Sequence, residues 1–247
     1  MSTIAIGDVH GNLGALDDLL GQLAAQLHER DTVVFLGDYI DRGPDSCRCV
    51  ERILEFRSAS RASVVTLLGN HEDWLLRSVK DPTRHSWILG MEAFPTIKSY
   101  SGAAAGRLRS AIEVLGPRVV TERTALPYDA FIGAMPDAHL EFLKELQLFH
   151  RVANTVFVHG GLDPCAGPVE EQNREALIWG TDEFPAAYGG PDLVVYGHHN
   201  DAILDVDGWP KPRFSSFAIG LDTIAHGVLT AVELPEGRII QSARHDA

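Results

Sequence analysis

The chain has 247 residues, a length that suits one sizeable domain needing no disulfide staples. Its 21 Lys and Arg residues against 34 Asp and Glu residues give a formal charge of −13, which excludes the basic surface that nucleic acids and acidic membranes require. Hydrophobic residues at 45% and charged residues at 22% exclude wholesale disorder. We therefore expect no nucleic-acid partner and no membrane partner.

We expect no signal peptide in the N-terminal segment. The apolar run of residues 3–6 lacks a basic region before it and ends at a glycine and an acid, unlike a signal peptide. No later segment approaches the ~20 apolar residues of a membrane-spanning helix. The chain has three cysteines, Cys47, Cys49 and Cys165. Their number and spacing fit neither a disulfide framework nor a four-cysteine zinc site, so we expect a reducing, cytoplasmic setting.

Five short segments rich in β-branched residues predict buried strands. They are residues 3–6, 32–36, 63–68, 155–158 and 193–196. None of them alternates apolar with polar residues, as expected of strands covered on both faces. Each is followed within two residues by a side chain that can bind a metal ion.

Helical patterns separate the first three strands. Leucines spaced three or four apart predict an amphipathic helix over residues 12–28, and Val50, Ile53 and Leu54 indicate a second helix before the third strand. This alternation predicts an α/β fold with a largely parallel sheet, in which ligands bind beyond the carboxyl ends of the strands. The five polar strand endings should therefore converge on one edge.

The remaining segments complete a single domain over residues 1–247. Residues 84–150 contain helical spacing in Leu140, Leu143 and Leu146 after Pro136, which predicts a helical insert. Such an insert would cap one end of the sheet or shape a substrate groove. Four apolar segments after residue 198 predict antiparallel strands that form a second sheet or extend the first: 202–206, 214–219, 228–234 and 239–240.

The polar residues that follow the strands have the chemistry of a catalytic metal site. They are Asp8, His10, Asp38, Asn70, His159 and His198. Oxygen and nitrogen ligands without thiolate suit manganese, iron or zinc, and differ from a closed structural zinc site. There are more ligands than one metal needs, and two ions ~3.5–4 Å apart could hold the attacking and leaving oxygens of a phosphoryl group. The sequence therefore predicts in-line hydrolysis of a phosphate ester.

Five motifs in order resemble those of the calcineurin-like metallophosphoesterases. They are Gly-Asp-Val-His-Gly at 7–11, Gly-Asp-Tyr-Ile-Asp-Arg-Gly at 37–43, Gly-Asn-His-Glu at 69–72, His-Gly-Gly at 159–161 and Gly-His at 197–198. The Asp41-Arg42-Gly43 extension is typical of the phosphoprotein phosphatase branch, which includes bacterial serine/threonine phosphatases and symmetrical diadenosine tetraphosphate hydrolases. The resemblance covers residues 3 to about 230 and implies a β-sandwich flanked by helices in α-β-β-α layers.

The resemblance also implies a division of the ligands between two divalent ions, of which manganese is the first choice and iron and zinc are the others. Asp8 and His10 would hold the first metal and Asp38 would bridge. The second metal would be held by Asn70, which also faces substrate, together with His159 and His198. Water between the two ions would supply the attacking hydroxide.

Three further residues have roles that their chemistry supports. Arg42 offers a planar fork of donors that matches phosphate oxygens. His71, directly after a metal ligand, is placed to protonate the leaving alkoxide, and Asp41 would hold its imidazole in the productive tautomer. We assign all three to catalysis, and Arg42 to substrate binding as well.

Several positions depart from the family pattern. Asn200 stands where nuclease-like branches have a second histidine, and the adjacent His199 is left out of the ligands. Thr181 occupies the place of a second phosphate-binding arginine, for which Arg174 is a candidate substitute. His226 stands where glycine is usual, near the cleft or facing solvent.

These observations favour a phosphatase acting on phosphoserine or phosphothreonine in proteins, because the second motif keeps Asp41 and no Lys/Arg cluster suggests a polyphosphate cradle. The alternative is a symmetrical dinucleoside polyphosphate hydrolase, which would cleave a phosphoanhydride with the same metals. A third hypothesis is a non-catalytic binding scaffold that kept the fold. The expected partner is therefore a phosphoprotein or a phosphorylated small molecule.

Overall fold

Two five-stranded mixed sheets form the centre of the computed structural model, which describes residues 1–245. The first sheet has the order β12-β11-β1-β2-β3 and the second has the order β4-β5-β6-β10-β9. The first contains β1 (Thr3–Ile6), β2 (Thr32–Phe35), β3 (Ser63–Thr66), β11 (Thr230–Leu234) and β12 (Arg238–Gln241). The second contains β4 (Phe149–Val152), β5 (Thr155–Val158), β6 (Leu193–Tyr196), β9 (Arg213–Phe214) and β10 (Ala218–Gly220).

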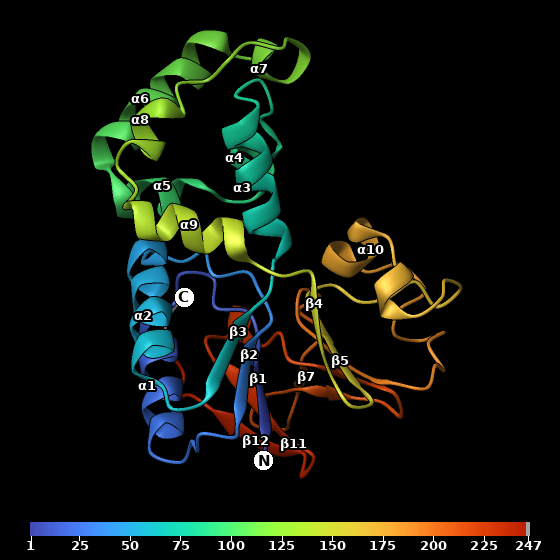
Figure 1. Ribbon diagram of the computed structural model, residues 1–247. Helices are drawn as coiled ribbons and strands as arrows, with labels where there is room; N and C mark the ends of the chain where they lie inside the picture. Colours follow the sequence, from blue (N-terminus) through green and yellow to red (C-terminus); the bar gives the residue numbers. More distant parts are fainter. Residues whose placement is uncertain (246–247) are drawn as a thin grey trace.

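Helices cover the outer faces of both sheets, so the α-β-β-α layering expected from the resemblance is confirmed (Figure 1). On the first sheet lie α1 (Leu13–Ala24) and α2 (Ser46–Ala59), and α3 (Asn70–Lys80) follows β3. On the second sheet lie α10 (Arg174–Trp179) and a short 3-10 turn, Val169–Glu171. Another 3-10 turn, Ile224–His226, precedes β11.

The core explains why the strand sequences show no polar alternation. Ile4 and Ile6 pack with the helices on the outer face, whereas Ala5 between them packs into the layer that joins the two sheets. Phe157 and Val195 of the second sheet meet the first sheet in that same layer. Both faces of each central strand are therefore buried, as the apolar runs predict.

Strand register brings the polar strand endings to one level. In the first sheet Ile6 pairs with Phe35, and Phe35 pairs with Thr66, all in parallel strands. In the second sheet Phe157 pairs with Val195, again in parallel. The residues that follow these strands consequently leave both sheets at the same edge.

The expected helix over residues 12–28 is present but ends earlier. Asn12 caps α1, its side-chain oxygen accepting a hydrogen bond from the Ala15 N–H at 3.0 Å. The helix ends at Ala24, and Leu27 still packs against the core from the following loop. The leucine spacing therefore indicates which residues are buried, and this pattern of buried residues extends slightly past the end of the helix.

A run of helices lies between β3 and β4, beyond the edge where the polar residues leave the sheets (Figure 1). We call residues 86–145 the helical insert. It comprises α4 (Ser86–Gly90), α5 (Phe94–Tyr100), α6 (Gly102–Leu115), α7 (Arg118–Thr121), α8 (Asp129–Ile132) and α9 (Asp137–Glu145). Residues 149 and 150, expected at the end of the insert, lie in β4.

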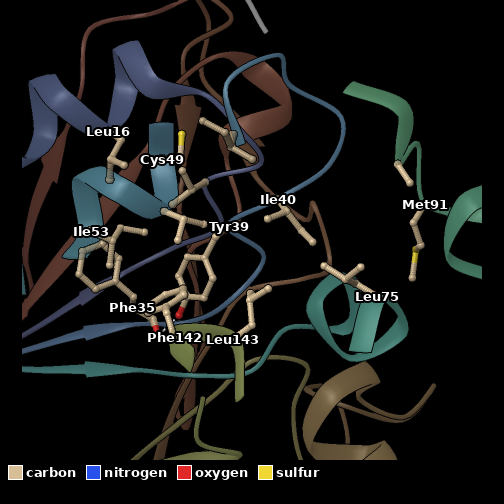
Figure 2. Close-up of a cluster of buried hydrophobic side chains, with 14 of the residues drawn as sticks. Leu16, Phe35, Tyr39, Ile40, Cys49, Ile53, Leu75, Met91, Phe142 and Leu143 are labelled. Carbon is tan, nitrogen blue, oxygen red and sulfur yellow. Dashed lines mark hydrogen bonds between the residues drawn. The ribbon is translucent and has the colours of Figure 1, made fainter. Parts of the chain in front are cut away.

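The helical insert shares a core with the first sheet (Figure 2). Tyr39, just after β2, packs edge-on against Phe142 of α9 with ring centroids 5.3 Å apart. Its hydroxyl donates a hydrogen bond to the Leu67 carbonyl at 2.8 Å. The insert is thus anchored on the loop that carries Asp38 and Asp41.

The antiparallel strands expected after residue 198 are present. Both sheets are mixed, because β11 runs antiparallel to β1 and β9 runs antiparallel to β10. The expected strand 214–219 is wrong as one element, since residues 215–217 form a turn between β9 and β10. The expected strand 202–206 shortens to β7 (Ile203–Leu204), which pairs with β8 (Pro210–Lys211). No helix among residues 1–245 is long and apolar enough to span a membrane.

Candidate metal centre and active site

The structure brings all six candidate ligands to the shared edge of the two sheets. We call them the ligand set: Asp8, His10, Asp38, Asn70, His159 and His198. The first four follow strands of the first sheet and the last two follow strands of the second. Five of them are buried, and His198 is partly buried. The predicted convergence of the strand endings is therefore present.

The turns that carry these residues have unusual backbone conformations. His10, Asp38 and His198 have φ values of 44°, 52° and 67°, in the left-handed region that side chains other than glycine rarely adopt. Asp41 and Arg42 share this conformation, with φ values of 71° and 64°. Such residues cluster at functional sites, where the surrounding structure holds the chain in place.

One half of the centre joins the two sheets through Asp38. Its Oδ1 lies 3.3 Å from His159 Nε2, and one ligand atom from each of Asp38, His159 and His198 lies within 4.8 Å of the others. The Asn70 Oδ1 lies 2.9 Å from His159 Nε2 and 3.0 Å from His198 Nδ1. Four potential ligand groups thus face one small volume.

The orientation of the Asn70 amide tests whether a cation fits there. With Oδ1 inward, the amide oxygen faces other acceptors, an arrangement that becomes favourable when a cation lies between them. With the amide reversed, Nδ2 would donate to the Asp38 carboxylate at 3.0 and 3.2 Å. The first orientation fits a divalent metal ion with oxygen and nitrogen ligands.

The other half of the centre surrounds His10. Its Nε2 is buried without a hydrogen-bond partner and lies 3.5 Å from Asp38 Oδ2 and 3.9 Å from Asp8 Oδ2. The opposite ring nitrogen, Nδ1, lies 2.9 Å from the Ile40 carbonyl, and His159 Nδ1 lies at the same distance from the Leu36 carbonyl. Donation to a carbonyl leaves the lone pair of Nε2 free for a metal in both residues.

Electrostatics favour metal-binding forms of these side chains. Burial lowers the pKa of His10 to about 3, and burial together with the neighbouring His159 lowers the pKa of His198 to about 3. Both imidazoles are therefore neutral near pH 7. Burial opposes ionisation of Asp38, but the His159 and His71 rings hold its pKa well below the usual range. Divalent cations held here would neutralise phosphate oxygens and lower the pKa of a water molecule.

The predicted catalytic residues lie beside this centre. His71 Nδ1 lies 2.8 Å from Asp41 Oδ2, in a pair that is almost completely buried. Burial alone would lower the pKa of His71, but the Asp38 charge and the Asp41 hydrogen bond raise it. The imidazole therefore holds a proton that it could give to a leaving oxygen.

Arg42 lies at the mouth of the site. Its guanidinium nitrogen Nη2 is 3.5 Å from His71 Nε2, and the residue is exposed. Arg42 lines a pocket of about 260 Å³ together with His10 and Glu92. A phosphate entering this pocket would meet the arginine fork and the His10 side chain.

Four residues around the site lack an assigned role in the sequence analysis. The Glu72 carboxylate accepts hydrogen bonds from the backbone N–H groups of residues 38, 39 and 40, which fixes the loop of the shared ligand. Asp222 is buried close to Asp8. Burial is the largest cause that raises the pKa of Asp8, and the charges of Asp222 and Asp38 raise it further. Trp87 and Thr96, from the helical insert, contact Asp41. Glu72 lies in the motif at residues 69–72, whereas Asp222, Trp87 and Thr96 lie outside the five motifs.

The positions that depart from the family pattern lie outside the ligand set. Arg174, the first residue of α10, forms an ion pair between its Nη2 and Asp73 of α3 at 2.6 Å. His199 Nε2 lies 2.7 Å from the Gly160 carbonyl. His226 is partly buried in the 3-10 turn before β11, next to Ala225, which lines the pocket at Arg42.

The family model described as calcineurin-like phosphoesterase matches residues 1–202, which include every residue of the ligand set. The chain belongs to this family. Family membership accounts for the two mixed sheets with flanking helices and for the order of the motifs. It also identifies the chain as an enzyme of the metallophosphoesterase type.

Relatives within the family differ in how much of the chain they match. A zinc-dependent endopolyphosphatase from Saccharomyces cerevisiae is 34% identical over 85 residues, 34% of this chain and 25% of that protein. The match thus spans only about a quarter of that relative. A symmetrical bis(5'-nucleosyl)-tetraphosphatase from Nitrosomonas europaea is 28% identical over 95% of this chain and 79% of that protein.

Among solved structures, that of a putative diadenosine tetraphosphatase superposes with a TM-score of 0.62. It is 23% identical, and the superposition covers 100% of this chain and 95% of that one. At this identity the likeness concerns the fold alone. The chain therefore shares its overall fold with that structure.

Proposed function

We propose that this chain hydrolyses dinucleoside tetraphosphates at a centre of two divalent cations bound by the ligand set. The observation that carries the two-metal assignment is the position of Asp38, which contributes to two groups of closely spaced ligand atoms. One group pairs it with His10 and His71, and the other with His159 and His198. A shared carboxylate between two such groups is the arrangement that a two-metal phosphohydrolase requires.

The choice of substrate rests on the relatives that extend along nearly the whole chain. The Nitrosomonas relative is named for symmetrical cleavage of bis(5'-nucleosyl) tetraphosphates. In that reaction water bonds to one phosphorus of the bridge, a P–O–P bond breaks, and two nucleoside diphosphates leave. Arg42 would bind the phosphate oxygens, and His71 would give its proton to the departing bridge oxygen.

A second candidate is hydrolysis of phosphoserine or phosphothreonine in proteins. The buried pair of His71 and Asp41 favours it, because an alkoxide leaving group depends on a proton donor far more than a nucleoside diphosphate does. Manganese remains our proposal for the metal in either case, since the ligands are oxygen and nitrogen without thiolate.

The cytoplasm is the location that we propose. All three cysteines, Cys47, Cys49 and Cys165, are free thiols in the structure. Free thiols persist in a reducing compartment, and a buried one such as Cys49 is compatible with a cytoplasmic enzyme. Expression of the full gene followed by cell fractionation tests this location.

One substrate panel tests the proposed function. Protein loaded with manganese is given diadenosine tetraphosphate and, separately, a phosphoserine peptide, with the Asp38→Asn variant as the control for both. We expect faster turnover of the dinucleotide, with adenosine diphosphate as the single product if cleavage is symmetrical. Faster turnover of the peptide would favour the second candidate. Activity no higher than that of Asp38→Asn on every substrate and metal would contradict both.

A further inference from the structure

The helical insert reaches the catalytic pair with two hydrogen-bond donors. The indole Nε1 of Trp87, in α4, donates to Asp41 Oδ2 at 2.8 Å. The hydroxyl of Thr96, in α5, donates to Asp41 Oδ1 at 2.6 Å. Asp41 Oδ2 also faces His71 Nδ1 at 2.8 Å. Both carboxylate oxygens therefore have partners, and two of the three partners come from the insert.

The hydroxyl of Thr96 makes all the hydrogen bonds that it can, one as donor and two as acceptor. Its single hydrogen goes to the Asp41 carboxylate, so its lone pairs accept hydrogen bonds from the Asp41 N–H at 2.8 Å and from Ser46 Oγ at 2.9 Å. Ser46 Oγ in turn accepts from the Asp41 N–H at 3.2 Å. Thr96 thus contacts the backbone and the side chain of one residue, which fixes how Asp41 presents its carboxylate.

The hydrogen bonds of Thr96 and Ser46 act on a residue, Asp41, whose backbone has an unfavourable conformation. A φ value of 71° places Asp41 in the left-handed region, which residues with a side chain rarely adopt. Its N–H donates hydrogen bonds to two hydroxyl groups and its carboxylate accepts hydrogen bonds from two residues of the insert, which together hold the residue in that conformation. Without them the carboxylate would be free to turn away from His71.

The donors themselves are held rigidly. Trp87 and Thr96 are both 0% exposed. The Trp87 ring stacks on Phe131 of α8, with centroids 5.5 Å apart and an interplanar angle of 27°. Tyr128 lies on the same side of the insert core, 6.1 Å from the Trp87 ring. The indole N–H therefore has one direction available, and that direction points at Asp41.

We propose that Trp87 and Thr96 are positioning residues, through which the helical insert orients the Asp41 carboxylate and thereby the proton on His71. The insert then contributes to the reaction as well as covering the sheet edge. The proposal rests on the proposed function in one respect, namely that His71 protonates a leaving oxygen. Neither residue is placed to touch substrate, so the effect of each must pass through Asp41.

Matched substitutions separate positioning from packing. Trp87→Phe removes the indole N–H and keeps an aromatic ring. Thr96→Val removes the hydroxyl and keeps the branched shape, whereas Thr96→Ser keeps the hydroxyl. Tyr128→Phe is the control, because it removes a buried hydroxyl from the same core, one that bonds the Arg84 carbonyl at 3.4 Å, without touching Asp41. If Trp87→Phe fails to fold, the two Thr96 variants still test the proposal.

The first measurement is the rate for phenyl phosphate relative to 2,4-dinitrophenyl phosphate, with bound metal counted in each variant. A poor leaving group needs the proton of His71 and a good one does not. We expect this ratio to fall roughly 10-fold in Trp87→Phe and Thr96→Val, with unchanged metal content, and to stay at the wild-type value in Thr96→Ser and Tyr128→Phe. Equal losses for both esters, or losses in Tyr128→Phe as large as those in Trp87→Phe, would overturn the proposal.

The second measurement does not depend on turnover. Proton NMR of the full chain prepared without metal should show a downfield signal from the His71 Nδ1–H, identified by its absence in His71→Asn. We expect the signal to shift in Trp87→Phe and Thr96→Val and to stay in Thr96→Ser and Tyr128→Phe. If Trp87→Phe and Thr96→Val match the wild-type protein in both the ester ratio and the proton signal, the proposal is overturned. If wild-type protein instead hydrolyses neither these esters nor diadenosine tetraphosphate while the signal shifts as expected, the proposed function fails and the positioning role stands.

Discussion

The sheet edge and the helical insert contribute to the site in different ways. At the edge, each ligand follows a strand within four residues, so neighbouring strands bring the chemistry together directly. The insert supplies none of the ligand set, yet Trp87 and Thr96 hold the partner of the proton-carrying histidine. The strand ends thus supply the ligand set, and the insert orients the Asp41 carboxylate beside it.

The largest effect should follow a change at the sheet edge. Asp38→Asn removes the carboxylate that faces both His10 and His159, so we expect metal affinity on both sides to fall by well over 100-fold, beyond the loss typical of residues that only support a ligand. Turnover should fall with it. Titration against a chromophoric chelator measures the affinity. Wild-type metal binding in this variant would show that Asp38 is not shared.

His71→Asn should separate proton transfer from metal binding. The residue lies between the edge and the insert, and its main contact is with Asp41 rather than with the ligand set. We expect turnover of substrates with poor leaving groups to fall about 10²–10⁴-fold, with metal content nearly intact. Steady-state kinetics and elemental analysis check both. Loss of both metals would instead assign His71 to the ligands.

Arg42→Ala should have a smaller effect, which changes how the enzyme binds and turns over substrate and leaves metal binding unchanged. The guanidinium lines the pocket with His10 and Glu92 and makes no contact that holds the metal centre. We expect kcat/KM to fall roughly 10–100-fold, because one charge-assisted, two-pronged contact with phosphate is lost. Arg42→Lys should recover only part of this loss, since lysine lacks the fork. An unchanged kcat/KM in Arg42→Ala would remove the residue from the site.

Metal removal should produce the smallest effect, on stability. The ligand set joins residues of the two sheets, so a bound metal favours their packed arrangement by about 2.7 kcal/mol at a concentration 100 times its Kd. For a chain of this size, we expect chelation to lower Tm by roughly 5–10 °C. Hydrogen exchange should show the lost protection at the ends of β1, β2 and β5. Loss confined to α6 and α7 would contradict this view of the sheet edge.

The convergence of the ligand set could be predicted because the strand endings have strong local signals, whereas the layered fold was predicted from the resemblance of the motifs to a known family. A run such as residues 32–36 must be a buried strand, and Gly37 allows the sharp turn that presents Asp38. The antiparallel direction of β11 could also be predicted, because turn residues separate the short apolar segments that follow residue 198. The turn at residues 215–217 was missed because Phe217 continues the apolar pattern of its neighbours.

The residues that position the acid could not be predicted. Trp87 and Thr96 look like ordinary core residues in the sequence, and only the folded insert brings them to Asp41 across 46 and 55 residues of chain. Arg174 illustrates the reverse case, because its charge suggested a phosphate contact and the structure pairs it with Asp73. Long-range hydrogen bonds leave no periodic signal, whereas strands and helices do.

The left-handed turns at His10, Asp38, Asp41, Arg42 and His198 limit how this protein can be engineered. Glycine would adopt these φ values at no steric cost, so a library selected for thermal tolerance alone should drift toward glycine at the very positions that carry the chemistry. Any attempt to make the enzyme more heat-resistant should therefore fix these five positions and randomise the outer helices.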